Sequence, residues 1–142
     1  MPAPAVQRTF EVDAPPLHAW ERLIAVRRWP DWAPHILAVT VLADGPIGPT
    51  TRGALRIKGF GRTTFRMSER DPPHRWEWVG GPLGLRIRYD HRFEEIRSAR
   101  TRLVWQVYLE GPLGVLVRPT FKRLYGHNVD RAIPHLKEWI TR

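Results

Sequence analysis

The sequence predicts an α+β fold, with an antiparallel sheet between a short N-terminal helical region and a long C-terminal helix. Apolar residues recur with a period of two from residue 35 to residue 110, which is typical of strands. Before and after that stretch the period is about 3.6, which is typical of amphipathic helices. The chain has 142 residues, 42% of them hydrophobic, and 7 are Trp. We therefore expect one domain, residues 1–142, with a sizeable core.

Composition and charge narrow the classes of function. The formal charge is +9, from 23 Lys and Arg against 14 Asp and Glu. The arginines are spread through the chain rather than gathered in a block, which favours a basic surface over a dedicated nucleic-acid site. No apolar run reaches the roughly 18 residues of a membrane helix, and the first residues do not read as a secretory signal, so we expect a cytoplasmic location. The absence of cysteine excludes disulfides and thiolate chemistry.

Prolines divide the N-terminal region into three short elements. Residues 6–13 alternate like a strand, and Asp13 or Ala14 is placed to cap a helix with proline in its first turn. Pro30 and Pro34 then permit only a single short turn. The expected apolar stripe of the helix consists of Leu17, Trp20, Leu23 and Ile24. The short turn is expected to be anchored by the rings of Trp29 and Trp32.

Six strands of a meander are expected next, because Gly, Pro, Asp or Ser bounds each alternating run. The strands are expected at residues 35–43, 51–59, 62–70, 74–80, 85–96 and 101–110. One face of the sheet is apolar and aromatic. The other face carries many arginines, whose charge is partly balanced by Glu77, Asp90 and Glu94. The inward face is predicted to include Leu55, Ile57, Phe65, Met67, Trp76, Trp78, Leu85, Ile87, Tyr89, His91, Phe93, Leu103, Trp105, Val107 and Leu109.

The C-terminal helix is expected to start near Pro119, which suits a first helical turn. Pro134 falls inside the pattern and predicts a bend near residues 130–134. The helical stripe consists of Phe121, Leu124, Tyr125, Asn128, Ala132, Leu136 and Ile140.

The order of these elements and the stretch FEVDAPPLHAWERLIAVRRWPDW, residues 10–32, resemble the START-like (SRPBCC) superfamily. Its members commonly begin with an apolar strand, then Ala-Pro, a tryptophan shortly afterwards and a W-P-x-W motif. The glycine pair Gly45 and Gly53 in the segment GPIGPTTRG is similar to the pattern of the polyketide cyclase/dehydrase and lipid-transport branch of this superfamily. The resemblance implies a helix-grip fold, in which a curved sheet wraps around the C-terminal helix and leaves a cavity for an apolar ligand. The superfamily includes lipid carriers, coenzyme Q binding proteins, aromatase/cyclases and hormone receptors.

Large rings on the inward face leave two interpretations open. They could line a ligand cavity, or they could fill the space as plain core. On the first interpretation the ligand-binding residues would be Phe65, Met67, Trp76, Trp78, Ile87, Tyr89, His91, Trp105, Tyr125 and Asn128. The segment 45–53 and the turn Gly59–Gly61 would then be the entrance lids.

Candidates for chemistry are few. Tyr89 and His91 share one face of a strand and are the candidate acid and base, with Glu69 as a third titratable group. The histidines show no metal-ligand spacing, and no nucleophile or phosphate-loop motif is present, so no metal and no cofactor is expected.

The leading hypothesis is a protein that binds or transports a small hydrophobic or aromatic ligand such as a lipid, quinone or polyketide-like molecule. One alternative is an aromatase/cyclase- or dehydratase-type enzyme without metal or cofactor. A second alternative is a basic-surface module for RNA or anionic membrane. It would require Arg56, Arg66, Arg86, Arg88 and Arg92 to form one uninterrupted positive field.

Overall fold

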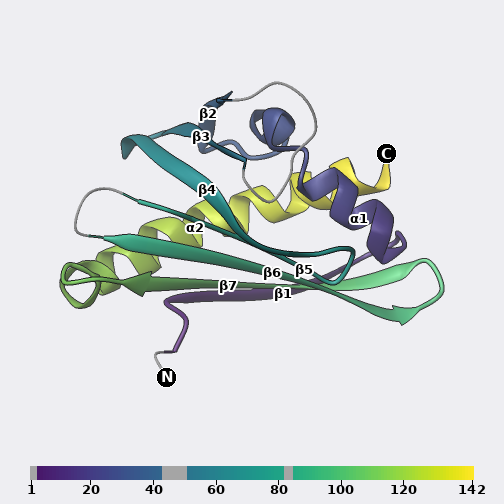
Figure 1. Cartoon of the computed structure of the whole chain (residues 1–142). Helices are drawn as coiled ribbons and strands as arrows, with labels where there is room; N and C mark the ends of the chain where they lie inside the picture. Colours follow the sequence, from purple (N-terminus) through teal and green to yellow (C-terminus); the bar gives the residue numbers. More distant parts are fainter. Residues whose placement is uncertain (1–2, 43–50, 82–84) are drawn as a thin grey trace.

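The computed structural model describes residues 3–42, 51–81 and 85–142, except the side chains of Glu69 and Arg70. Seven antiparallel strands form one sheet in the order β1-β7-β6-β5-β4-β3-β2, and the elements follow the chain as expected (Figure 1). The bounds are β1 Val6–Val12, α1 Pro16–Leu23, the 3₁₀ helix η1 Val26–Asp31, β2 Ile36–Val41, β3 Arg52–Ile57, β4 Gly61–Asp71, β5 Arg75–Gly80, β6 Arg86–Arg97, β7 Arg100–Glu110 and α2 Gly114–Thr141.

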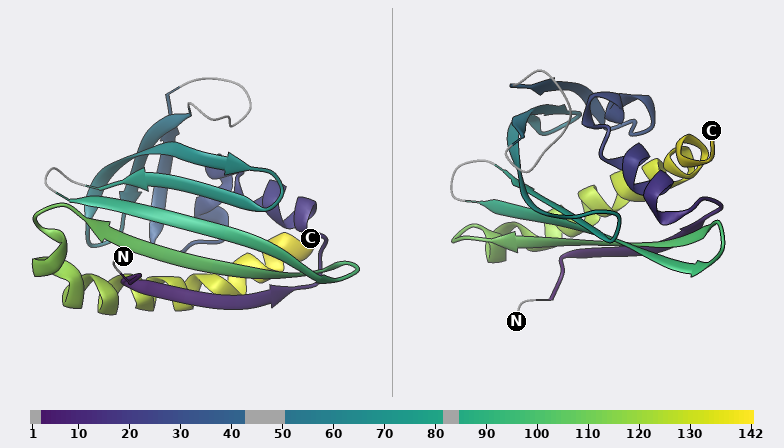
Figure 2. Two further views of the ribbon diagram at one scale, coloured as in Figure 1. Left: turned by 60° about the horizontal axis from the view of Figure 1, so that its bottom comes forward. Right: turned by 45° about the vertical axis from the view of Figure 1, so that its right-hand side comes forward.

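The sheet is strongly curved, and α2 lies along its concave side (Figure 2). β1 joins the sheet beside β7, at the opposite edge from β2. α1 packs beside the C-terminal end of α2, where His18 Nε2 lies 2.7 Å from the carbonyl oxygen of Ile140. This arrangement is the predicted helix-grip fold.

The predicted parity of the strands is confirmed. On β6, Ile87 is 7% exposed, whereas the side chain of the neighbouring Arg88 is 25% exposed and turns to the convex face. A register slip of one residue would exchange the two faces. Because β5 pairs with β6 through Trp78↔Tyr89 and Trp76↔His91, the inward rings of the two strands lie side by side.

Two expectations for the N-terminal helix are corrected. The N-cap of α1 is Pro15, and no side chain caps the helix. Asp13 instead pairs with Arg100, so its carboxylate is taken by a cross-strand partner. Leu17, expected on the buried stripe, is 52% exposed, whereas Trp20 is buried as predicted.

The C-terminal helix begins five residues earlier than predicted, at Gly114 rather than Pro119. Pro119 therefore lies beyond the first turn, where it removes one backbone hydrogen bond without ending the helix. The second half of α2 contacts β1 closely at Gly126, where a Cβ would lie 3.0 Å from the Arg8 guanidinium. Arg8 also holds this half of the helix through Asp130, at 2.6 Å.

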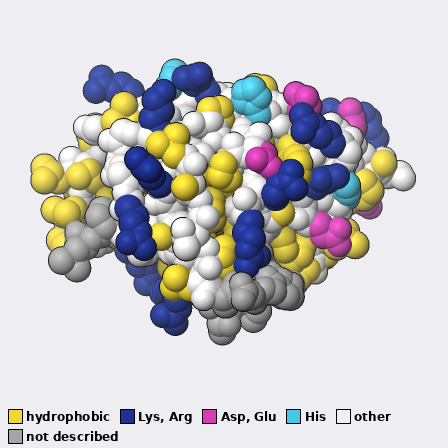
Figure 3. Space-filling model, turned by 90° about the horizontal axis from the view of Figure 1, so that it is seen from above, with side chains coloured by type: hydrophobic (Ala, Val, Ile, Leu, Met, Phe, Trp, Pro, Cys, Tyr) yellow, Lys and Arg dark blue, Asp and Glu magenta, His cyan; other side chains and the backbone are white. Residues whose placement is uncertain are grey.

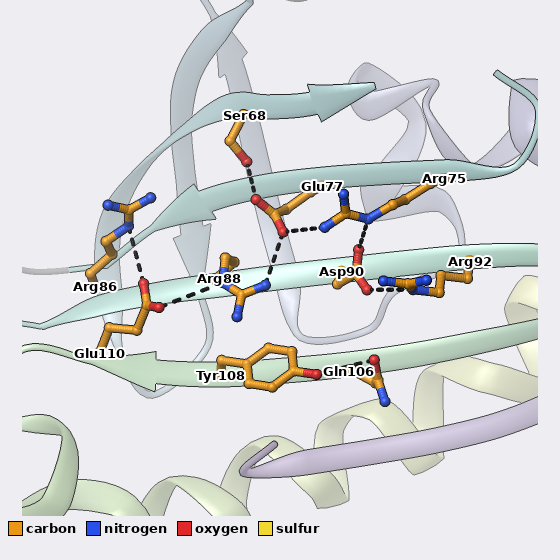
Figure 4. Close-up of polar contacts among 10 residues, drawn as sticks. All are labelled: Ser68, Arg75, Glu77, Arg86, Arg88, Asp90, Arg92, Gln106, Tyr108 and Glu110. Atoms are coloured by element: carbon orange, nitrogen blue, oxygen red, sulfur yellow. Dashed lines mark hydrogen bonds and ion pairs between the residues drawn. The ribbon is translucent and has the colours of Figure 1, made fainter. Parts of the chain in front are cut away.

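The convex face carries an ion-pair network rather than a bare positive field (Figure 4). Glu77 is only 5% exposed and accepts hydrogen bonds from Ser68 at 2.8 Å, Arg75 at 2.9 Å and Arg88 at 3.0 Å. Asp90, 2% exposed, accepts from Arg75 at 2.8 Å and from Arg92 at 3.0 Å. Three of the arginines expected to form a continuous field are thus held by carboxylates, since Arg86 also pairs with Glu110.

Candidate functional site

A cavity of about 390 Å³ opens between the first half of α2 and strands β3, β4 and β6. This volume lies within the usual range for small-molecule pockets. The wall is mostly apolar, and its polar side chains other than two tyrosines are those of Arg62, Thr63 and Thr120. The remaining lining residues are Ile57, Phe60, Leu85, Ile87, Tyr89, Leu116, Val117, Phe121 and Tyr125.

α2 supplies its share of the wall through residues spaced one turn apart. Val117, Phe121 and Tyr125 fall at i, i+4 and i+8 and so share one face of the helix. The rings of Phe121 and Tyr125 are stacked, with centroids 5.0 Å apart. Across the cavity, Tyr89 of β6 stacks on Trp78 at 3.8 Å. The wall therefore contains aromatic rings from both the helix and the sheet.

Two tyrosine hydroxyl groups belong to this wall. Burial raises the pKa of Tyr125 well above its ordinary value of 10. The pKa of Tyr89 is also raised well above its ordinary value, first by burial and then by the nearby Tyr125. Both phenols consequently stay protonated across neutral pH and can serve as hydrogen-bond donors.

Beyond Tyr125 the concave face is closed by packed rings. Trp29 of η1 lies 5.3 Å from Trp78 and 5.7 Å from Trp76, measured between ring centroids. His91 stacks on Trp76 at 5.1 Å and meets Trp105 edge-on at the same distance. This half of the fold follows the second interpretation of the sequence, in which the rings fill the core.

A small inner chamber of about 30 Å³ remains among these rings. Its walls come from α1, η1, β2, β5, β6, β7 and α2. They consist of Leu23, Trp29, Trp32, His35, Ile36, Trp76, Trp78, His91, Trp105, Tyr125 and Val129. Tyr125 lines both the inner chamber and the outer cavity, so its ring stands at the boundary between them.

The two histidines of the inner chamber are neutral at pH 7. Burial lowers the pKa of His35 to about 4. Burial also lowers the pKa of His91 to about 4, against the opposing effects of the Asp90 charge and a backbone hydrogen bond with Trp76. A neutral imidazole has one donor and one acceptor nitrogen, and which nitrogen carries the proton depends on its partners.

The ten predicted ligand-binding residues are divided between several places. Ile87, Tyr89 and Tyr125 line the outer cavity, whereas Trp76, Trp78, His91 and Trp105 line the inner chamber with Tyr125. Phe65 lines a shallow groove beside β3 and β5. Met67 accepts the indole N–H of Trp76 at 2.8 Å. Asn128 borders a small cleft with His35, Lys58 and Arg131.

The candidate acid and base are also separated by this division. Tyr89 lines the outer cavity and His91 the inner chamber. The side chain of Glu69 lies outside the described ones. Of the two predicted lids, the turn Gly59–Gly61 borders the cavity through Phe60, and most of the segment 45–53 falls outside the described residues.

The mouth of the cavity was predicted only in part. Leu116 and Val117 were excluded because the helix was expected to begin after them, although Val117, Phe121 and Tyr125 already show the helical spacing. The Gly59–Gly61 turn was predicted as an entrance lid, but Phe60 was not among the predicted ligand-binding residues. Only the pairing of β3 with β4 brings that turn opposite the start of α2.

The mouth of the cavity is bordered by exposed apolar side chains, and the chain segments that form most of its wall are basic in sequence. Leu113, Val115 and Leu116 at the start of α2 are 40%, 87% and 77% exposed, and Phe60 is 51% exposed. Residues 51–66 and 111–125, which contain most of the cavity wall, carry several Lys and Arg but no Asp or Glu. Seen from above, the end of the molecule at the left shows Lys, Arg and hydrophobic side chains, whereas the visible acidic side chains lie toward the other end (Figure 3).

A curved antiparallel sheet that grips a long helix around an apolar cavity is a helix-grip fold. A model of the polyketide cyclase / dehydrase and lipid transport family matches residues 3–138. The chain belongs to this family. No curated protein matches the sequence.

Solved structures show the same fold at low sequence identity. The Zhui aromatase/cyclase of Streptomyces sp. R1128 superposes with a TM-score of 0.80 at 18% identity, over 96% of this chain and 93% of that one. A protein from Thermus thermophilus gives a TM-score of 0.76 at 19% identity, over 96% of both chains. A START superfamily protein from Mycobacterium smegmatis gives 0.72 at 19% identity, also over 96% of both chains.

No helix among the described residues has the length and apolar character needed to cross a membrane. Within the same residues, no three His, Asp or Glu side chains gather where they could hold a metal ion.

Proposed function

We propose that this protein binds a small hydrophobic or aromatic ligand in the outer cavity and carries it between sites in the cytoplasm. The observation that carries the proposal is the 390 Å³ cavity with its apolar wall beneath the first half of α2. Burial of apolar surface supplies affinity at about 25 cal/mol per Å² before the costs of association. A flat ring system suits this wall because Tyr89, Phe121 and Tyr125 present aromatic faces.

Membership of the family supports the proposal, because its description includes lipid transport. The exposed apolar rim adds a route for such a ligand. Leu116 and Phe60 both line the cavity and project at its mouth. An apolar rim among Lys and Arg suits transient contact with an anionic membrane surface, from which an apolar ligand could enter without crossing water.

The test is a titration with the neutral fluorophore N-phenyl-1-naphthylamine, whose emission rises in apolar surroundings. We expect saturable binding that changes little between low and high salt, because burial of a neutral ligand is not screened. Val117→Trp should fill the cavity and weaken binding at least tenfold. Lys122→Trp is the matched control, because Lys122 is exposed on the same helix and does not line the cavity.

Two results would contradict the proposal. One is an absence of saturable binding by the folded protein, and the other is equal affinity in the Val117 and Lys122 variants. A partner that binds with steep salt dependence and leaves the cavity unoccupied would favour a basic-surface module instead. The structure gives that alternative less support, because carboxylates interrupt the arginines of the convex face.

A cyclase or dehydratase activity is the second candidate. It is favoured by the family and by the two protonated phenols in the cavity wall, which could donate a proton or a hydrogen bond to a ketone. Incubation with a poly-β-ketone and detection of cyclised product would test it. In an enzyme, Tyr89→Phe should cost roughly 10²–10⁴ in rate while the substrate still binds. A carrier would show no turnover in either form.

A further inference from the structure

Five side chains in the wall of the inner chamber carry a polar atom that has no hydrogen-bond partner among the described residues. Among the described residues, the indole N–H groups of Trp32, Trp78 and Trp105 and the Nδ1 atoms of His35 and His91 make no hydrogen bond. All five side chains are buried, with at most 9% of each residue exposed. All five belong to the wall of the same 30 Å³ chamber.

The other two indoles of this wall are satisfied. Trp29 donates its N–H to the carbonyl oxygen of Leu23 at 2.8 Å, and Trp76 donates to the Met67 sulfur. Leaving a buried donor without an acceptor carries the full cost of removing that group from water. Several such groups around one small space are therefore a feature of the site that plain core packing does not explain.

The hydrogen-bonding capacity of these five unpartnered groups indicates which kind of ligand atom would satisfy them. An indole can only donate a hydrogen bond, so three of the five groups require an acceptor. The histidines can adapt their tautomer to an acceptor as well. A space of about 30 Å³ holds one or two atoms of the size of oxygen, and it has no room for a ring.

We propose that the inner chamber is a subsite for an acceptor oxygen, such as a ketone carbonyl, at the leading end of the ligand whose apolar body occupies the outer cavity. Tyr125 lines both spaces, so a modest shift of its ring would let the oxygen-bearing end pass. This inference rests on the proposed binding function and names its ligand class: an apolar, ring-containing molecule with a terminal hydrogen-bond acceptor.

The experiment compares two probes of the same shape. The probe 2-acetylnaphthalene carries a carbonyl oxygen where 2-isopropenylnaphthalene carries a CH₂ group. We expect the ketone to bind about five to ten times more tightly, as one net hydrogen bond would give. In a ¹⁵N–¹H spectrum, the ketone alone should move the indole N–H resonances of at least two of Trp32, Trp78 and Trp105.

Variants then locate the preference. Trp78→Phe combined with Trp105→Phe removes two unpartnered donors and keeps aromatic rings, and it should bring the affinity ratio of the two probes close to one. Trp139→Phe is the control, because its buried indole donates to the carbonyl oxygen of Arg22 and lines neither the chamber nor the outer cavity, and it should keep the ratio. The spectrum of the unmodified protein decides the question if the double variant does not fold.

Equal affinity of the two probes would overturn the inference and leave the proposed binding function standing, as expected if the chamber held only water. A preference that survives in the double variant would also overturn it, because the oxygen would then lie elsewhere. If neither probe binds, the proposed function fails and the inference fails with it.

Discussion

The two halves of α2 face the same curved sheet but meet it differently. From Gly126 to the C-terminus the helix packs closely, and Val129, Ala132, Leu136 and Ile140 are each at most 1% exposed. Between Leu116 and Tyr125 its residues instead line the 390 Å³ cavity that lies between the helix and the sheet.

The size of the side chains opposite each half of α2 explains why one half packs closely and the other leaves a cavity. Opposite the second half of α2, Trp20 of α1, Trp29 of η1 and Trp32 just after η1 belong to the core between helix and sheet. Opposite the first half, no such layer exists among the described residues, and the sheet offers Ile57, Thr63 and Ile87. Tryptophans can fill the depth of a curved sheet, whereas these shorter side chains cannot reach the helix. The packed half therefore provides stability, and the open half is free to bind a ligand.

The largest expected effect comes from deleting a ring in the packed half. Trp76 is 1% exposed, so Trp76→Ala should lower the free energy of unfolding by about 3–5 kcal/mol. Phe121→Ala, in the wall of the open half, should cost about 1 kcal/mol or less, because no tightly packed cavity is created. The denaturant midpoints of the two variants measure the contrast, and losses of equal size would contradict the division into two halves.

Acidification should lower the stability of the protein through the two buried histidines of the packed half. Because the folded-state pKa values of His35 and His91 lie at about 4, below the ordinary value of 6.5, the unfolded chain binds more protons in this range. The contribution of the two neutral histidines to the free energy of unfolding is fully present above pH 6.5 and is lost as the pH falls toward 4. The loss is on the order of 2 kcal/mol per histidine at about pH 4.5.

Denaturant titrations at about pH 7, 5.5 and 4.5 would measure this dependence, and His91→Gln should flatten it. The charged neighbours are Asp90 for His91, and Lys58 and Arg131 for His35. A slope unchanged by His91→Gln would show that His91 is not buried in its neutral form.

A smaller effect is expected on the convex face. Glu77 joins Arg75 and Arg88, so Glu77→Gln should cost about 1–2 kcal/mol by leaving these guanidinium groups less well paired. Glu94, exposed and 3.9 Å from Arg102, serves as the control, and Glu94→Gln should change stability by less than about 0.5 kcal/mol. Equal effects would mean that the network is no stronger than an ordinary surface pair.

The smallest effect concerns a single hydroxyl group in the cavity. For a carrier, Tyr89→Phe should leave binding of 2-acetylnaphthalene nearly unchanged, because the variant keeps the aromatic ring of the outer wall and the carbonyl oxygen is placed in the inner chamber, which Tyr89 does not line. Binding of N-phenyl-1-naphthylamine should stay nearly unchanged. Complete loss of binding in a folded variant would contradict the assignment of Tyr89 as one part of a broad apolar wall.

The sequence predicted the strands, their parity and the C-terminal helix because these depend on local periodicity, whereas the grip of the sheet around that helix was implied by the family resemblance. Alternation along β6 assigned Ile87 and Arg88 to opposite faces without any knowledge of the partner strands. The division between cavity and filled core was not predictable in this way. It depends on how far Trp29 reaches across from η1, and a strand's own pattern contains no information about such a neighbour.

The cavity residues were predicted only where they belong to strong patterns. Tyr89 and Tyr125 lie on clear apolar stripes, whereas Phe60 and Leu116 reach the mouth from a turn and a helix start. Pro119 concealed that helix start, since a proline signals a first turn by propensity alone. The unpartnered groups of the inner chamber were equally hidden, because hydrogen-bond satisfaction is a property of the assembled core.

The most direct test of the two-half account is a crystal structure of the protein with N-phenyl-1-naphthylamine bound. The account predicts the probe between α2 and β6, in contact with Ile87, Val117 and Phe121, with the packing of Trp29 on Trp76 and Trp78 unchanged. A probe seated on the convex arginine face, or one that displaces Trp29 and occupies the packed half, would contradict it.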